Sequence, residues 1–366
     1  MECVSRGRVY PTLRNMNLTE LRKTISALDE ASMAAARLRQ ETLTKPVCSL
    51  GILEELSIQL AGIFANPQPS VTRKAVIVMA ADHGVTAQGV SAYPAEVTPQ
   101  MVLNFLAGGA AINVLARQAG ARVSIVDVGV AFDMGVQPGL VSKKVAFGTA
   151  DFTKGPAMTA AQAESAIRVG MEQLEIEYEA GLDLVATGDM GIGNTTSSSA
   201  IIAAIGELPP EEVVGRGTGI DDAGMARKAA VIKQALAINK PQPDDAFDVL
   251  CKVGGFEIAG LAGVIIGAAS KRIPVVIDGF ISGAAALIAT GMVPEVKPYM
   301  IAGHHSVERG HRAMLDYLGL QPLLDLRLQL GEGTGSALAF HVIEAATRIL
   351  IEMATFAEAG VSEKQG

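Results

Sequence analysis

Short apolar runs that lack polar alternation recur along the chain, and each is followed by glycine with aspartate or histidine. They occupy residues 75–80, 123–126, 182–187 and 274–277, with a weaker run at 297–302. A strand without alternation is typical of a sheet buried on both faces. Ala-rich segments with helical spacing separate these runs, at 99–119, 159–179, 195–205, 223–238 and 256–269. Strands and helices in alternation predict an α/β fold, with a parallel sheet covered by helices on both faces.

Two helical patterns precede the first strand, at about 18–40 and 49–64, and a last one follows at 337–357. Helices of this length before any strand indicate a separate helical element, and the last helix can pack against them. We therefore expect a small helical domain formed by residues 1–70 and 337–366. Residues 71–336 would form the large α/β domain.

Charge and composition exclude several classes of partner. The formal net charge of −8 disfavours nucleic acid and anionic membranes as partners. No uninterrupted apolar run reaches membrane-spanning length, and the first residues do not resemble a secretory signal. Three scattered cysteines indicate a reducing compartment without a disulfide framework or a structural zinc site. The expected location is the cytoplasm.

Polar residues gather where the predicted strands end. Asp82, Asp127, Asp189 and Asp278 each follow a strand closely, and His304-His305 follow the weaker fifth strand. Ligands of open parallel sheets bind outside the carboxyl ends of the strands. We therefore expect a polar, ligand-facing rim there, although chance or helix capping by aspartate is the alternative.

Two glycine-rich loops are candidates for binding a phosphate. Gly188 to Thr196 joins a predicted strand to a helix, and its glycines free backbone N–H groups to meet an anion at the helix N-terminus. A tight turn with a capped helix is the alternative. The second loop, 215–222, is followed by Lys228, which either pairs with a phosphate or lies on a solvated helix face.

The stretch Gly331-Glu332-Gly333-Thr334-Gly335-Ser336 places one carboxylate among three glycines. We interpret Glu332 as a general base held over a pocket. The alternative is a helix cap with a solvated Glu332. Tyr93 and Met101 belong to a long loop after the first strand, which either lines a pocket for a flat aromatic ligand or simply packs.

The histidines allow a different hypothesis. If the strand ends converge, Asp82, His83, Asp278, His304, His305 and His311 could bind a metal ion, and the protein would be a metal-dependent phosphoesterase. No spacing fixes two of these histidines on one helix face. A nucleotide-binding regulatory module without catalysis is the third hypothesis.

Four ordered motifs together resemble a known family. They are Ala80-Ala81-Asp82-His83-Gly84-Val85, Gly191-Ile192-Gly193-Asn194-Thr195-Thr196, Gly303-His304-His305-Ser306 and Leu330-Gly331-Glu332-Gly333-Thr334-Gly335. In this order and at this separation they are similar to the nicotinate-nucleotide:dimethylbenzimidazole phosphoribosyltransferases of cobalamin synthesis. The resemblance covers nearly the whole chain from about Leu21.

The resemblance implies a doubly wound, Rossmann-like parallel sheet with a small helical domain built from both chain ends. It implies a cytoplasmic homodimer that needs neither metal nor other cofactor. Its substrates would be nicotinate mononucleotide and a benzimidazole, 5,6-dimethylbenzimidazole in the named reaction. Which base is used in the cell stays open.

The resemblance also implies roles for individual residues. Glu332 matches the catalytic base. The phosphate would be bound by Gly191, Ile192 and Gly193 and approached by Lys228, with Gly217 beside it. Asp278 and Gly279 match a strand end near the ribose, Ser306 lies where the nicotinate carboxylate is expected, and Tyr93 and Met101 match the base pocket. Asp189 departs from the family pattern, since some relatives carry glutamate there. Because the aspartate side chain is shorter, a direct role for Asp189 in the reaction stays open.

Overall fold

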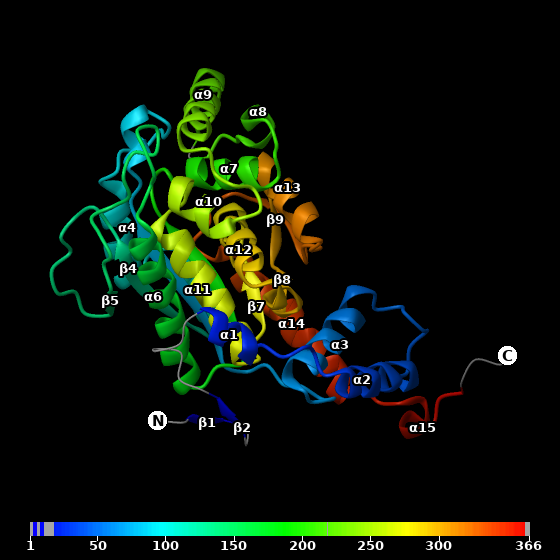
Figure 1. Cartoon of the computed structure of the whole chain (residues 1–366). Coiled ribbons are helices and arrows are strands. Elements are labelled where there is room, and N and C mark those ends of the chain that lie inside the picture. The colour runs from blue at the N-terminus through cyan, green and yellow to red at the C-terminus, as the bar shows by residue number, and fades with distance from the viewer. Residues whose placement is uncertain (1–2, 6–7, 11–17, 218, 363–366) are drawn as a thin grey trace.

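A six-stranded parallel sheet forms the centre of the molecule (Figure 1). The computed structural model describes residues 3–5, 8–10, 18–217 and 219–362. The strand order is β5-β4-β3-β6-β7-β8. In chain order the strands are β3 (Lys74–Ala81), β4 (Ala121–Gly129), β5 (Leu140–Ser142), β6 (Leu184–Met190), β7 (Val275–Ile277) and β8 (Met300–Ala302).

The central strand β3 explains why the apolar runs lack alternation. All eight of its residues are buried. Ala75, Ile77 and Met79 belong to one hydrophobic core, whereas Val76 and Val78 belong to a second. Because successive side chains point to opposite faces of a sheet, these two cores lie on its two sides. The expectation of a parallel sheet covered on both faces is confirmed.

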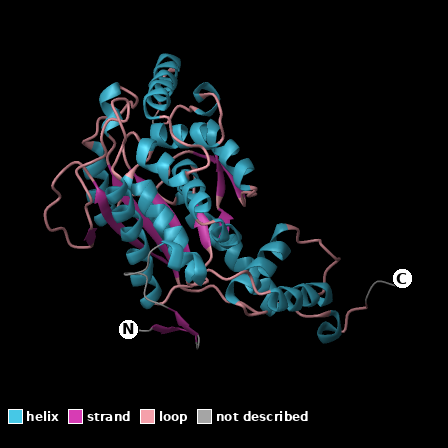
Figure 2. Cartoon of the chain, viewed as in Figure 1, coloured by secondary structure: helices cyan, strands magenta, loops and turns pink. Residues whose placement is uncertain are grey.

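Helices surround the sheet in Figure 2, and the two cores are supplied mostly by different helices. The first core contains side chains of α6 (Ala160–Glu179), α7 (Asn194–Ile205), α9 (Asp222–Asn239), α10 (Ala246–Val253), α11 (Phe256–Ser270), α12 (Phe280–Met292) and α13 (Arg309–Leu318), together with Ile63. The second contains side chains of α3 (Ile52–Phe64), α4 (Val97–Leu106), α5 (Ala111–Ala119) and α14 (Thr334–Glu352).

The remaining elements are short or peripheral. β9 (His304–Ser306) and β10 (Leu324–Leu328) form a separate parallel pair, and β1 (Cys3–Ser5) pairs antiparallel with β2 (Arg8–Tyr10). The other helices are α1 (Leu18–Thr24), α2 (Glu30–Thr42), α8 (Pro210–Val213) and α15 (Phe356–Ala359), with 3-10 turns η2 (Gly84–Gln88) and η3 (Pro294–Tyr299).

Two predicted helices are each interrupted. The pattern at 18–40 divides into α1 and α2, because Asp29 caps α2 by accepting the Ser32 N–H at 2.8 Å. The pattern at 99–119 divides into α4 and α5, with Gly108 between them at a φ of 75°. Residues 97–119 are long and apolar enough to cross a membrane. The break leaves helices of 10 and 9 residues, whereas a transmembrane helix needs about 20.

Helices from both ends of the chain meet beside the sheet, at the lower right of Figure 1. Ala36 of α2, Ala61 of α3 and Leu350 of α14 form a small buried cluster. The Arg39 guanidinium donates to the carbonyls of Leu350 and Ile351 at the end of α14. Parts of the predicted helical domain, residues 1–2, 6–7, 11–17 and 363–366, lie outside the described residues.

The strand order fixes where a ligand can bind. From β3 the chain first adds β4 and β5 on one side, then returns to add β6, β7 and β8 on the other. The loops after β3 and β6 therefore diverge to opposite sides. In open parallel sheets the crevice at such a point is the usual ligand site.

Candidate active site

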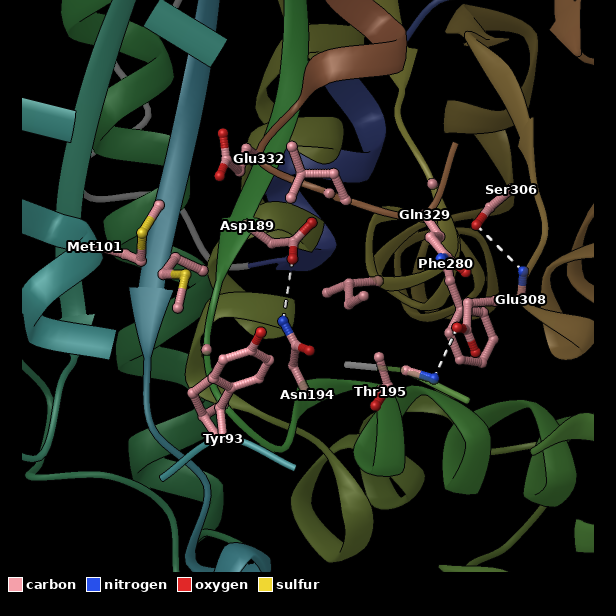
Figure 3. Close-up of a pocket in the computed structure, with 18 of the residues that line it drawn as sticks. Tyr93, Met101, Asp189, Asn194, Thr195, Phe280, Ser306, Glu308, Gln329 and Glu332 are labelled. Atoms are coloured by element: carbon pink, nitrogen blue, oxygen red, sulfur yellow. Dashed lines mark hydrogen bonds between the residues drawn. The ribbon is translucent and has the colours of Figure 1, made fainter. Parts of the chain in front are cut away.

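A cavity of about 410 Å³ lies at this point, bordered by the segments that follow β3, β6, β7, β9 and β10 (Figure 3). Of the twelve residues given a catalytic or substrate-binding role from the sequence, nine line it: Tyr93, Met101, Asp189, Gly191, Ile192, Gly217, Gly279, Ser306 and Glu332. His304 of the predicted polar rim lines it as well. Gly193, Lys228 and Asp278 lie behind this lining and contact it. Asp82 and Asp127 do not line the cavity, so the predicted acidic rim is only partly a ligand-facing surface.

The loop that carries Glu332 has an unusual backbone. Gly331, Glu332 and Gly333 have φ angles of 84°, 63° and 93°. Glycine adopts such angles without steric cost, whereas the positive φ of Glu332 is unfavourable unless the surroundings fix it. A Cβ on Gly333 would lie 2.7 Å from Val76 Cγ1, and one on Gly188 would lie 2.4 Å from the Glu332 carbonyl oxygen. The loop therefore needs glycine both within it and beneath it.

The Glu332 side chain is 5% exposed and points into the cavity (Figure 3). Its Oε2 accepts the Ile112 N–H at 3.2 Å. Burial raises the pKa of this carboxyl, the Asp278 charge raises it further, and the Ile112 N–H moderates the rise. The alternative of a solvated Glu332 beside a helix cap is wrong, because Gly333 occupies the N-cap position without a side-chain bond.

Asp278 fixes the Glu332 loop through hydrogen bonds to its backbone. Its Oδ2 accepts the Gly333 N–H at 3.2 Å and its Oδ1 accepts the Ser336 N–H at 2.8 Å. Burial raises the pKa of Asp278, while His304 and the backbone donors counteract that effect. Asp278 thus acts on the cavity through the loop, and Gly279 beside it supplies the lining.

Asp189 ends β6 and faces the cavity together with Glu332 (Figure 3). Its Oδ2 accepts from the Asn194 side-chain amide at 3.0 Å. Burial raises the pKa of Asp189 well above its ordinary value, and the charges of Asp278, Glu257 and Glu332 add to this. The surroundings of Asp189 therefore favour its neutral form.

The loop Gly191-Ile192-Gly193 leads into the N-terminus of α7. Gly193 is left-handed with a φ of 98°, and a Cβ on Gly191 would lie 2.3 Å from the Ala81 carbonyl oxygen. α7 has no side-chain cap, because its N-cap residue is Gly193, and the side chain of Asn194 bonds to Asp189. A helix N-terminus without a capping side chain can accept an anion, which favours the phosphate interpretation over a capped turn.

Lys228 approaches the same helix end from α9. It is 1% exposed and its Nζ donates to Thr195 Oγ1 at 2.8 Å. Burial lowers its pKa to about 8, although the Glu308 charge acts in the other direction. The solvated helix face is therefore wrong for Lys228. Gly217 lies next to its ammonium group, and the Gly217 N–H donates to Glu308 Oε1 at 2.9 Å.

Apolar side chains line the other parts of the cavity. Tyr93, Val97 and Met101 come from the segment after β3, and Leu330 lies across from them. Tyr93 and Leu330 are 55% and 58% exposed, so they form the rim. Ser306 lies near Phe280 and Gly279 on a different side (Figure 3). The cavity therefore has apolar lining near Tyr93 and Met101 and also near Phe280.

The predicted metal cluster is not assembled. His83 Nε2 bonds to Glu257 Oε1 at 2.7 Å, and His311 Nδ1 accepts the Ser306 N–H at 2.9 Å. Burial lowers the pKa of His311 to about 3, so it is neutral. Within residues 3–5, 8–10, 18–217 and 219–362, no group of three or more His, Cys, Asp or Glu side chains could hold a metal ion.

Comparison with known proteins agrees with this geometry. The profile of a family described as Phosphoribosyltransferase matches residues 25–361. The nicotinate-nucleotide–dimethylbenzimidazole phosphoribosyltransferase of Chloroflexus aurantiacus is 64% identical over 93% of this chain and 97% of its own length. The enzyme of the same name from Geobacter sulfurreducens is 55% identical over 94% of this chain and 98% of its own length. The chain belongs to this phosphoribosyltransferase family.

The fold of this chain is also found in a solved structure of a relative. The crystal structure of CobT from Thermus thermophilus is 50% identical, with a TM-score of 0.88, and covers 91% of this chain and 100% of the other. The agreement extends over the α/β body with its six-stranded sheet and the small β9–β10 pair.

Sequence reasoning missed several residues that line the cavity of this phosphoribosyltransferase: Asn194, Thr195, Phe280, Glu308, Gln329 and Leu330. Asn194 and Thr195 were within a recognised motif, but their side chains were given no role in the site. Glu308 carried a signal, since it follows Ser306 by two residues at a strand end. Leu330 stood at the start of a recognised motif but was given no role, and Phe280 and Gln329 had no signal, because apolar and amide side chains occur at many turns.

Proposed function

We propose that this phosphoribosyltransferase transfers the phosphoribosyl group of nicotinate mononucleotide to 5,6-dimethylbenzimidazole, in the synthesis of the nucleotide loop of cobalamin. The products are α-ribazole 5′-phosphate and nicotinate. One observation carries this proposal: a buried carboxylate, Glu332, shares a single cavity with an uncapped helix N-terminus that can hold a phosphate. The names of the relatives agree with it.

The reaction requires one base. The bond between ribose C1′ and the pyridinium nitrogen breaks, and its electron pair leaves with nicotinate, so no general acid is needed. One benzimidazole nitrogen forms the new bond to C1′, and the proton on the other nitrogen passes to Glu332. Its raised pKa makes the carboxylate a better base than an exposed glutamate. Attack from the face opposite nicotinate gives the α-anomer.

The other residues would hold the substrates. Gly191, Ile192 and Gly193 with the start of α7 would bind the phosphate, and Lys228 beside Gly217 would supply positive charge. Two rings held on either side of one ribose would account for part of the rate. Ser306 would meet the nicotinate carboxylate, Asp278 and Gly279 would lie near the ribose, and Tyr93 and Met101 would contact the benzimidazole. Asp189 would favour the cationic ribosyl transition state when ionised.

We further infer the architecture and setting of the enzyme. The strand order supports a doubly wound, Rossmann-like sheet. The cluster of Ala36, Ala61 and Leu350 supports a small helical domain from residues 1–70 and 337–366, beside a large domain of residues 71–336. We propose a cytoplasmic homodimer that uses no metal or cofactor.

The direct test follows nicotinate release from nicotinate mononucleotide by chromatography, with and without dimethylbenzimidazole and in the presence of EDTA. We expect release that depends on the base and yields α-ribazole 5′-phosphate. Glu332→Gln should lower kcat at least about 100-fold, since one general base contributes this much, with little change in nucleotide binding. The rate of the wild type should fall as the pH decreases, because protonated Glu332 cannot act as a base. Since burial raises the pKa of Glu332, the fall should begin at a higher pH than for a glutamate with the ordinary pKa of 4.5.

Two outcomes would contradict the proposal. Nucleotide that stays intact with the base present would remove the transferase assignment. Full activity of Glu332→Gln would leave the transferase in place but remove Glu332 as its base. Glu352→Gln, at the far end of the same helix α14, is the matched control and should keep full activity.

A further inference from the structure

The first turn of α4 connects two parts of the cavity. Val97 and Met101 line the apolar end, while Thr98 between them is fully buried. The hydroxyl oxygen of Thr98 accepts the Ile192 N–H at 3.1 Å. Ile192 is the middle residue of the glycine loop before α7. One hydroxyl thus joins the segment that follows β3 to the segment that follows β6.

The Thr98 hydroxyl also lies beside the Asp82 carboxylate at the end of β3. Burial raises the pKa of Asp82, and the Thr98 hydroxyl and the Ala131 N–H hold that rise down. Asp82 Oδ2 accepts the Ala131 N–H at 2.8 Å, which ties this carboxylate to the segment after β4. A hydroxyl can accept from one group and face a carboxylate with its proton. The Thr98 hydroxyl accepts from Ile192 in this way, whereas Asp82 Oδ1 is buried without a hydrogen-bond partner among the described residues.

The glycine loop needs such an anchor. Gly191 and Gly193 give the backbone freedom and no side chain to fix it. The peptide between Gly191 and Ile192 is held at both of its polar atoms: its N–H by Thr98, and its carbonyl by the Asn194 N–H at 3.1 Å. Fixing this peptide fixes the direction in which the following N–H groups point at the start of α7.

We propose that Thr98 is a positioning residue, whose hydroxyl sets the Gly191–Gly193 loop to receive the nucleotide phosphate and links that loop to the base-binding side of α4. This inference rests on the proposed assignment of the loop to the phosphate of nicotinate mononucleotide.

Thr98→Val tests the inference, because it removes the hydroxyl and changes the volume little. The Ile192 N–H then loses its acceptor in a water-free interior. We expect the KM for nicotinate mononucleotide to rise about tenfold, the KM for dimethylbenzimidazole to change less than about threefold, and kcat to fall less than about threefold. Thr98→Ser keeps the hydroxyl and should restore the nucleotide KM to within about twofold of the wild type.

Thr347→Val is the matched control. Thr347 is 1% exposed and its hydroxyl donates to the Glu344 carbonyl within α14 at 2.9 Å. The site lies about 20 Å along the helix from Thr334, at about 1.5 Å per residue. This variant makes the same chemical change and should leave both KM values unchanged. If Thr98→Val does not fold, Thr98→Ala makes the same comparison with Thr98→Ser.

Inorganic phosphate supplies a second readout. It should compete with nicotinate mononucleotide in the wild type, and its inhibition constant should rise in Thr98→Val in parallel with the KM. Competition in the wild type with an unchanged constant in Thr98→Val would overturn the role of Thr98 and leave the phosphate site intact. No competition in an active wild type would overturn the phosphate assignment and this inference with it. A Thr98→Ser variant as impaired as Thr98→Val would also overturn it.

Discussion

At the scale of single residues, the cavity is surrounded by ionisable groups that the fold keeps from water. Burial shifts each of them toward its neutral form: it raises the pKa of Asp189, Glu308 and Glu332 and lowers that of Lys228. A bound dianionic phosphate would favour the charged form of Lys228. Without the phosphate, the nearest partner of the Lys228 ammonium group is the Thr195 hydroxyl. Nucleotide binding should therefore depend on the charge of Lys228.

Lys228→Met should raise the KM for nicotinate mononucleotide about 30- to 100-fold, since a charge-assisted contact to phosphate is lost, and change kcat much less. In the wild type, the KM should rise with pH above about 8, where Lys228 loses its proton. The free energy of unfolding should change in the opposite sense: the protein becomes more stable as the pH rises, while nucleotide binding becomes weaker. Because the folded-state pKa lies below the ordinary value of 10.5, folding is favoured as the pH rises through this window. Initial rates between pH 6.5 and 9.5 measure the first effect.

Lys233→Met is the control, because Lys233 lies on the same helix with an exposed side chain. It should keep the nucleotide KM and its pH dependence. A KM for Lys228→Met that equals the wild-type value would show that the phosphate binds elsewhere.

At the scale of elements, the loop between β10 and α14 is held by its glycines as much as by its hydrogen bonds. Gly333 has a φ of 93°, and an added Cβ would lie 2.7 Å from Val76 Cγ1 on the central strand. Gly333→Ala therefore combines backbone strain with a clash in the core. We expect it to destabilise the fold by about 2–4 kcal/mol and to lower kcat at least tenfold, since Glu332 moves with the loop. Chemical denaturation and steady-state rates measure the two effects.

Gly360→Ala is the control, because it introduces backbone strain without a clash that could displace a loop. Gly360 ends α15 with a φ of 62° and has nothing within 4 Å of an added Cβ. It should cost about 1 kcal/mol and leave the rate unchanged. Equal losses of activity in the two variants would mean that the clash at Gly333 does not position Glu332.

The elements differ in how far they could be predicted. Five of the six strands of the sheet were recognised because burial on both faces removes alternation, whereas the edge strand β5 was missed because it has three residues and none of them is fully buried. Glu332 was recognised because an isolated carboxylate among glycines has no structural use. α12 was missed because Phe280 to Ala289 are all buried, which erases helical periodicity. β9 and β10 were missed because each is short and their pairing joins residues 20 or more positions apart, such as His304 and Leu324. The break between α4 and α5 had a signal in the sequence, the glycine at position 108. The break between α1 and α2, before Asp29, had none, because it lies within a continuous helical pattern.

At the scale of the whole molecule, arginines attach the helices from the two chain ends. Arg272, which follows α11, donates to the Ile63 and Gly62 carbonyls at 2.7 and 2.6 Å, at the end of α3. Arg39 of α2 donates to Leu350 and Ile351 at the end of α14. A cation at a helix C-terminus satisfies carbonyls that have no partner in the helix and interacts favourably with the helix dipole. These contacts add to the apolar packing that α3 and α14 share in the second core.

Arg39→Met tests whether these helices behave as a domain of their own. It removes the donors at the end of α14, where the carbonyls then depend on water, and should cost about 1–3 kcal/mol. If residues 1–70 and 337–366 unfold separately, hydrogen exchange should increase in α2, α3 and the end of α14, while β3 and β6 keep their protection and kcat/KM stays near the wild-type value. Arg37→Met, on the exposed face of the same helix, should change neither. Increased exchange that extends equally to β3 and β6 would mean that the chain unfolds as one unit. The boundaries at about residues 70 and 337 would then describe a surface feature of a single domain.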